Sequence, residues 1–277
     1  MSVKIGFVNQ KGGVGKTTLG MLTCTALSAA PFNKKCAFID CDSQESAVMQ
    51  RRKDIYTVSE ELSYQKLKEE NQCLSPEETE IKLEQYFSGI REKISSDPNK
   101  YFSYPVFYCE TEKLMELIVE LEDQHDFDFI FVDMPGQAQG DGLSTLLITL
   151  DHAFVPVESG DFDIASSISF LEQKLFKFKK FKESRGSDLF LNINIVFNKV
   201  KDTLRYKDTI LSFKERFKDD PRVNLLDESK CLSDSVFYKD NTSTYMSILD
   251  APTKSKTEKE KQNQFSIFVT EFLNVVQ

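Results

Sequence analysis

A glycine-rich loop between a strand-like run and a helix constrains the fold of this chain more than any other feature. Residues 11–18 read K-G-G-V-G-K-T-T, directly after the apolar run 3–9 and at the start of helical periodicity over 16–30. Glycines let consecutive backbone N–H groups curl around phosphate oxygens, and the helix N-terminus adds positive potential there. The residues predicted to cradle phosphate are Gly12, Gly13, Val14, Gly15, Lys16, Thr17 and Thr18.

Two side chains of this loop extend the prediction from a phosphate to a metal-bound nucleoside triphosphate. Lys16 follows the last glycine and is placed to reach the β- and γ-phosphates. The hydroxyl of Thr17 is placed to ligate Mg²⁺. We therefore expect a nucleotide and Mg²⁺ to bind together at this loop.

The rest of the chain alternates short apolar runs with helical stretches. The further strand-like runs cover residues 36–40, 105–109, 127–133, 153–157 and 189–197. Runs this short and this apolar are typical of strands buried on both faces. Helical periodicity appears between them, at 112–122 and 164–182. The pattern predicts an α/β fold, a doubly wound and mostly parallel sheet with helices on both faces, as in P-loop NTPases.

One polar stretch interrupts this alternation. Residues 58–100 are charged and helical in character, and within 60–97 ten acidic residues stand against five basic ones. We expect residues 1–277 to form a single domain that carries 58–100 as an acidic helical insertion. The whole chain has a net charge of −9, which argues against coating nucleic acid by bulk charge. Because so much of the acidity lies in the insertion, the remainder can still present a basic face to DNA.

The cysteines do not form the pattern of a metal site. The six cysteines lie at positions 24, 36, 41, 73, 109 and 231, without a C-x-x-C pair, and the chain has two histidines. We expect no zinc or iron–sulfur centre within one chain and reduced thiols in a cytoplasmic protein. No run of 18 apolar residues appears, so a membrane span is not expected.

Acidic side chains follow two of the predicted strands. Asp40 and Asp42 come at the end of the run 36–40, and Asp133 closes the run 127–133. Ligands of open α/β sheets bind at the carboxyl ends of the strands, so these carboxylates are expected beside the phosphate loop. An aspartate that closes an apolar strand is the Walker B arrangement, which holds Mg²⁺ directly or through water. Gly136, three residues later, is placed to offer its backbone N–H to a γ-phosphate.

The loop and its neighbours resemble the ParA/MinD family of ATPases. The sequence N-Q-K-G-G-V-G-K-T-T is similar to the deviant phosphate loop of that family, in which an extra lysine, here Lys11, precedes the glycines. Gln10 stands where the general phosphate-loop pattern has its first glycine. The D-C-D-S-Q segment at 40–44 resembles the family's D-x-D-P-Q segment, with Ser43 in place of proline. The resemblance covers about residues 1–55 and 102–250.

The resemblance implies a role for four side chains. It implies that Lys11 crosses a dimer interface to the nucleotide of the partner, and that Asp42 positions the attacking water. Asp40 would support Mg²⁺ through water, together with Thr17 and Asp133. Asn198 would contact adenine, although residues 225–233, where the family often completes the base pocket with a proline, contain none.

The implied activity is hydrolysis of ATP to ADP and phosphate, with Lys11, Lys16 and Asp42 as the catalytic residues. ATP would favour a homodimer and ADP would release it, as in a ParA-type switch that partitions or positions plasmid or mobile-element DNA. The implied partners are nonspecific DNA and a ParB-like protein, and the implied location is the cytoplasm, in association with the nucleoid. The lysines of residues 174–182 are the candidate DNA contacts, on a helix that we expect to bury Leu171, Leu175, Phe178 and Phe181 and to point its lysines outward.

Two other functions remain open from the sequence. One is a MinD-like positioning ATPase at a membrane, and the other is an ATP-switched regulator of a protein partner in conjugative transfer. A membrane-binding helix needs basic residues around its apolar stripe. The stripe from Phe265 to Val276 contains no lysine or arginine, so we expect it to pack on the protein instead.

Overall fold

The computed structural model describes the chain except residues 71–73, 136–140, 187–190, 200–203 and 228–235. The described residues form a seven-stranded sheet of order β3-β2-β4-β1-β5-β6-β7, with every neighbouring pair parallel. The strands are β1 (Val3–Phe7), β2 (Cys36–Asp40), β3 (Val106–Tyr108), β4 (Phe129–Asp133), β5 (His152–Val157), β6 (Asn192–Phe197) and β7 (Val223–Leu226). The predicted α/β class with a parallel sheet is confirmed, and β7 is an additional strand that the apolar runs did not predict. Residues 189 and 190 of the last predicted run lie outside the described part.

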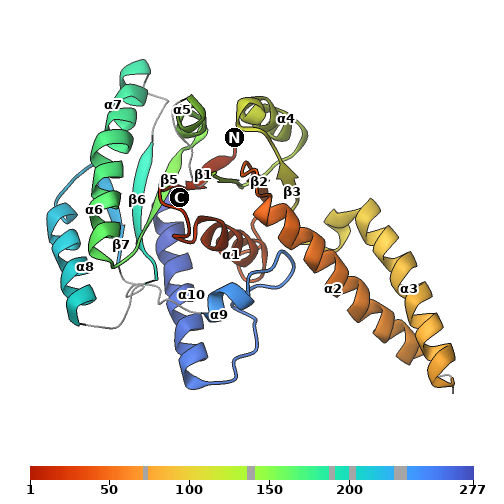
Figure 1. Ribbon diagram of the computed structural model, residues 1–277. Helices are drawn as coiled ribbons and strands as arrows, with labels where there is room; N and C mark the ends of the chain where they lie inside the picture. Colours follow the sequence, from red (N-terminus) through yellow and green to blue (C-terminus); the bar gives the residue numbers. More distant parts are fainter. Residues whose placement is uncertain (71–73, 136–140, 187–190, 200–203, 228–235) are drawn as a thin grey trace.

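Helices cover both faces of this sheet (Figure 1). They are α1 (Lys16–Ser28), α2 (Ser46–Glu69), α3 (Pro76–Ser96), α4 (Leu114–Gln124), α5 (Asp141–Thr149), α6 (Asp161–Phe170), α7 (Phe176–Arg185), α8 (Leu204–Phe217), α9 (Val236–Asp240) and α10 (Lys256–Val276). One buried cluster joins the sheet to α4, α5, α6, α7 and α8, and a second joins it to α1, α9 and α10. The sheet is therefore doubly wound, with one apolar layer on each side.

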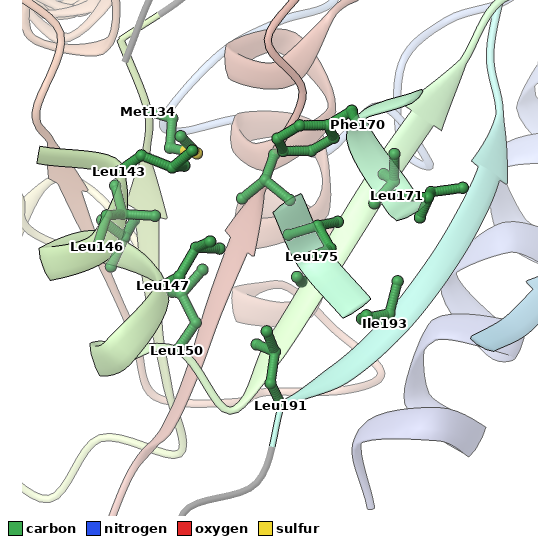
Figure 2. Close-up of a cluster of buried hydrophobic side chains, with 14 of the residues drawn as sticks. Met134, Leu143, Leu146, Leu147, Leu150, Phe170, Leu171, Leu175, Leu191 and Ile193 are labelled. Atoms are coloured by element: carbon green, nitrogen blue, oxygen red, sulfur yellow. The ribbon is translucent and has the colours of Figure 1, made fainter. Parts of the chain in front are cut away.

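The first of these clusters is built mainly from leucines. Figure 2 shows Leu143, Leu146 and Leu147 of α5 on the same face of the sheet as Leu171 and Leu175. All five are buried. Burying a leucine side chain contributes roughly 1.5–3 kcal/mol, so this apolar layer holds α5 and the segment Leu171–Leu175 firmly on the sheet.

The second cluster depends on α10. Its apolar stripe is buried, and the ring of Phe272 stacks 4.7 Å from Phe154 and 6.0 Å from Phe131, which belong to the sheet. The prediction that this stripe packs on the protein is confirmed. None of the helices that the structure describes combines the length and the apolar composition needed to cross a bilayer.

The predicted lysine face of residues 174–182 is wrong in part. Lys182 is buried and donates a hydrogen bond to the Leu150 carbonyl at 2.6 Å, and Lys179 donates to the Leu191 carbonyl at 3.1 Å. The spacing i, i+4, i+7 and i+11 from Leu171 runs through Leu175 and Phe178 to Lys182, so Lys182 shares the buried face of the helix. Phe181 lies at the edge of that face and is 42 % exposed.

The helices of the predicted insertion are α2 and α3, which form an antiparallel hairpin at one end of the sheet (Figure 1). The first of them begins at Ser46, before residue 58, so it continues directly from the segment that follows β2. That the chain is a single domain with 58–100 inserted stays a prediction.

A buried histidine makes the stability of this fold depend on pH. His152 begins β5, with its ring nitrogens 3.3 Å from the amide nitrogens of Asn192 and Asn194 on β6. Burial lowers its pKa from 6.5 to about 4. Protons therefore bind the unfolded chain more readily than the folded one between these values, and folding stability falls as the pH drops through that window.

We expect the protonation of His152 on unfolding to lower the free energy of unfolding by roughly 3 kcal/mol between pH 7 and pH 4. Urea unfolding across that range measures the loss, with His152→Gln as the comparison. The variant should lose less stability on acidification than the native chain. Equal pH slopes for the two proteins would contradict the assignment.

Candidate nucleotide site

The phosphate loop leaves β1 and opens α1 in a conformation that requires glycine. Gly13 and Gly15 have φ of +77° and +91°, in the left-handed region that other residues avoid. A Cβ on Gly15 would also lie 2.6 Å from Nδ2 of Asn198. The loop is tied to β5 by Asn9, which accepts the Lys11 N–H through Oδ1 and donates to the Pro156 carbonyl at 2.9 Å.

Lys16 is held inside this loop. Its side chain is buried, and its ammonium donates to the Lys11 carbonyl at 3.2 Å. Burial lowers its pKa, while the carboxylates of Asp133 and Asp42 act in the opposite direction. An ammonium curled back into its own loop in this way points to the space that the loop encloses, where an anion can replace the carbonyl as its partner.

Thr17 and Asp133 meet across the top of the sheet. The Thr17 hydroxyl donates to Oδ2 of Asp133 at 2.6 Å. Burial raises the Asp133 pKa to about 7, with the neighbouring Asp40 adding to the effect, while the Thr17 hydrogen bond and the Lys16 ammonium act against the rise. A hydroxyl beside a buried carboxylate is the hard oxygen pair that Mg²⁺ prefers, and a divalent ion there would restore the charge of Asp133. These residues therefore fit the magnesium ion of a nucleotide complex.

Asp40 and Asp42 lie close together but make different contacts. Asp40 is buried and accepts backbone N–H groups of Asp42, Ala47 and Val48, which fixes the start of α2. Burial raises its pKa, and those backbone bonds act against the rise. Asp42 instead lines the cavity in front of the loop. Both aspartates thus reach the predicted place, with Asp42 facing the ligand space and Asp40 anchoring backbone.

The extra lysine of the loop contacts its own chain. Lys11 forms ion pairs with Glu158, at 3.0 Å, and with Asp163, both of which follow β5. Lys199, after β6, reaches the Gly13 carbonyl and lies 3.5 Å from Glu158. Glu158, Asp163 and Lys199 were not predicted, because their residue types and local sequence are those of ordinary surface positions. What could have indicated them is their position after the carboxyl ends of β5 and β6, the edge of the sheet that the loop also occupies.

Asn198 packs against the loop as well. Its buried amide donates to the Val14 carbonyl at 2.8 Å. Asn198 therefore supports the phosphate loop, whereas the predicted partner of its side chain is adenine. Gly136 lies outside the described residues. The remaining part of the predicted base pocket, 225–233, is described only up to residue 227.

A cavity of about 1120 Å³ joins these groups. It is lined by Gly12, Gly13, Gly15, Lys16, Thr17, Thr18, Asp42 and Asn198 among the predicted residues. Its far wall comes from the α2 residues Gln50, Lys53 and Asp54 and from the segment Tyr238–Ser247, which the sequence did not single out. Asp54 accepts the N–H and the hydroxyl of Thr244 at 2.7 Å each, so this wall is tied to α2.

Residues 5–242 match the family described as the CobQ/CobB/MinD/ParA nucleotide binding domain. No curated protein matches the sequence.

Solved structures share the fold at low identity. A plasmid partition protein of Borrelia burgdorferi B31 bound to AMPPNP is 19 % identical, with 98 % of this chain and 99 % of that chain covered and a TM-score of 0.53. The MinC:MinD cell division complex of Aquifex aeolicus is 17 % identical, with 100 % and 96 % covered and a TM-score of 0.53. McdA of Cyanothece in complex with ATP is 13 % identical, with 98 % and 96 % covered and a TM-score of 0.56. At these identities the likeness shows a common fold.

Gly15→Ala tests the geometry of the loop. The variant places a side chain at a φ of +91° and against the Asn198 amide, so we expect about 1–3 kcal/mol less stability and a large loss of nucleotide binding. Urea unfolding and the thermal shift with nucleotide and Mg²⁺ measure the two effects. Gly89→Ala is the control, since it adds a Cβ in open space within α3 and should stabilise by roughly 0.5–1 kcal/mol. Unchanged nucleotide binding by Gly15→Ala would contradict the assignment.

Proposed function

The chain belongs to the CobQ/CobB/MinD/ParA family of nucleotide-binding domains, and from this premise we propose that it is a magnesium-dependent ATPase that switches between monomer and dimer. The observation that carries the proposal is the contact of the Thr17 hydroxyl with Asp133, 2.6 Å apart beside the buried ammonium of Lys16. These groups together supply a cation, two metal ligands and a backbone cradle, which are the parts that phosphoryl transfer needs.

Each predicted residue has a task in the proposed site. Loop N–H groups and Lys16 neutralise the charge of the β- and γ-phosphates, and Thr17 with Asp133 holds Mg²⁺. Asp42 orients the attacking water, and Asp40 supports the metal through water while it fixes the backbone of Asp42. In this proposal the Gly136 N–H binds the γ-phosphate, and Asn198 contacts the base.

Dimerisation completes the site in this proposal. Lys11 leaves Glu158 and Asp163 and reaches the nucleotide of a second copy, so ATP favours the dimer and hydrolysis releases it. The Lys11 ammonium is then paired in both states, with Glu158 and Asp163 in the monomer and with the nucleotide of the second copy in the dimer. The dimer is the form that we propose binds nonspecific DNA and a ParB-like partner, in partition or positioning of plasmid or mobile-element DNA.

The choice of DNA over a membrane rests on α10. Its apolar residues, including Phe265, Phe268 and Phe272, are buried against the sheet, so the helix has no free apolar face for lipid. Lys174 and Lys177, two of the exposed lysines of α7 and the turn before it, are the proposed DNA contacts.

Asp42→Ala separates binding from hydrolysis. We expect this variant to bind ATP and dimerise as the native chain does, while its hydrolysis rate falls about 100-fold or more because no group orients the water. Phosphate release measures hydrolysis, and sedimentation with ATP and Mg²⁺ measures the dimer. Lys16→Ala, which should lose nucleotide binding, and the surface variant Asp126→Ala serve as comparisons. A fully active Asp42→Ala enzyme would refute the role of Asp42.

The DNA proposal predicts retention on random-sequence DNA that needs ATP and disappears at high salt. Replacing Lys174 and Lys177 by glutamate should weaken retention at every salt concentration. The slope of the logarithm of the binding constant against the logarithm of the salt concentration should fall in magnitude by about one for each lost phosphate contact. Reversal of Lys256 and Lys259, which are exposed on α10, is the control with the same change in net charge. Equal losses from both pairs would show that only overall charge matters, and flotation with liposomes in place of DNA retention would favour a membrane role.

A further inference from the structure

The hairpin of α2 and α3 extends away from the sheet and its flanking helices (Figure 1). Its base is well packed, because Arg51 and Asp54 of α2 and Ile94 of α3 are buried. A ring contact between Tyr56 and Phe87, with centroids 4.8 Å apart, joins the two helices near the middle of the hairpin. The hairpin is thus an ordered arm whose outer half has only its own two helices to pack against.

That outer half has little core of its own, because the buried side chains of α2 beyond Tyr56 are those of Ser59 and Ser63. Between Tyr64 and Lys93, the described residues include no buried side chain. The apolar side chains along this stretch, Leu67, Leu83, Phe87 and Ile90, are only partly buried. Two helices alone cannot enclose such side chains, whereas a third helix laid against them would.

The outward face of α3 carries an acidic stripe with an apolar centre. Glu77, Glu80, Ile81 and Glu84 follow the spacing i, i+3, i+4, i+7, so they share one side of the helix. All four are exposed, with Ile81 at 57 %. Within the described part of the chain, none of the three glutamates has an ion-pair partner. Like charges at this spacing repel and destabilise the helix, so cations from another molecule bound between them would reduce the repulsion.

The charge of the arm excludes several occupants. Ten acidic residues against five basic ones over 60–97 repel DNA, anionic lipid and the same arm of a second copy. What complements a stripe of three carboxylates around an isoleucine is a helix with lysines or arginines on both sides of a leucine-like centre.

We propose that the α2–α3 hairpin is the docking arm for a basic amphipathic helix of a partner protein, received along Glu77, Glu80, Ile81 and Glu84. The lysines or arginines of that helix pair with the three carboxylates, and its apolar residues cover Ile81 and the half-exposed side chains of the outer hairpin.

The arm is connected to the nucleotide site through α2. This helix starts directly after Asp42, and Asp40 holds its first N–H groups, those of Ala47 and Val48. Farther along, Arg51 donates to Thr244 and to the Tyr104 carbonyl, so α2 bridges the arm and the cavity wall. A partner on the arm therefore acts on the helix that follows the Asp42 loop and that Asp40 holds at its start. This coupling rests on the proposed ATPase function, whereas docking itself does not.

The test uses the full chain without nucleotide and a synthetic helical peptide of leucines and lysines. Fluorescence anisotropy measures its affinity, and hydrogen exchange maps the peptide on the protein. We expect slowed exchange in α2 and α3, and no binding of the matched peptide with glutamate in place of lysine. Protection confined to other elements would overturn the proposal.

Matched charge reversals separate the arm from bulk acidity. Glu77→Lys, Glu80→Lys and Glu84→Lys together should raise the Kd at least tenfold. Glu112→Lys, Glu116→Lys and Glu120→Lys, exposed on and before α4, change the net charge equally and should leave the Kd nearly unchanged. Ile81→Ser should weaken binding several-fold in a chain of native charge. Equal weakening by both triple variants would overturn the proposal.

The two proposals fail in different measurements. ATP hydrolysis with and without the peptide gives the coupling, and the expected result is a changed rate in the native chain but not in the triple variant of α3. If the chain hydrolyses no ATP, the proposed function fails while the docking result stands. If the ATPase is active and the peptide finds no site on the hairpin, docking fails alone.

Discussion

The parallel pairing of β1, β4 and β2 is the constraint on which the rest of the structure depends. In the register of this sheet, Asp133 stands beside Phe7 on one neighbour and beside Asp40 on the other. The chain leaves β1 into the phosphate loop and leaves β2 toward Asp42. Three neighbouring strand ends therefore bring together the loop, the carboxylate proposed to hold the metal and the carboxylate proposed to orient water. A shift of one residue would turn these side chains to the other face of the sheet.

This convergence concentrates buried charge. Lys16, Asp40 and Asp133 are each less than a tenth exposed, and burial is the main cause of the pKa shift in all three. Removing charges from water costs free energy that the site alone recovers only in part. In the proposed function a magnesium–nucleotide complex supplies the missing counter-charges, which would link ligand binding and the stability of the fold at the same atoms.

The fold class and the phosphate loop could be predicted because their signals are local. Residues 11–18 carry their own backbone geometry, and strands buried on both faces are visible as apolar runs. The partners of Lys11 could not be predicted, because Glu158 and Asp163 reach it only through the pairing of β1 with β5. The burial of Lys182 was missed for another reason, since the Leu150 carbonyl that accepts from its ammonium comes from a distant part of the chain.

The position of α10 has a consequence for how the molecule comes into being. The rings of Phe131 and Phe154, on the central strands, are covered by Phe272, which the ribosome adds long after the phosphate loop has emerged. Domains generally fold as units during synthesis, and here the layer under β1, β4 and β5 stays uncovered until residues 256–276 arrive. A nascent chain therefore displays its phosphate loop on an unfinished scaffold, and competence for ligand begins only after this last helix has been made.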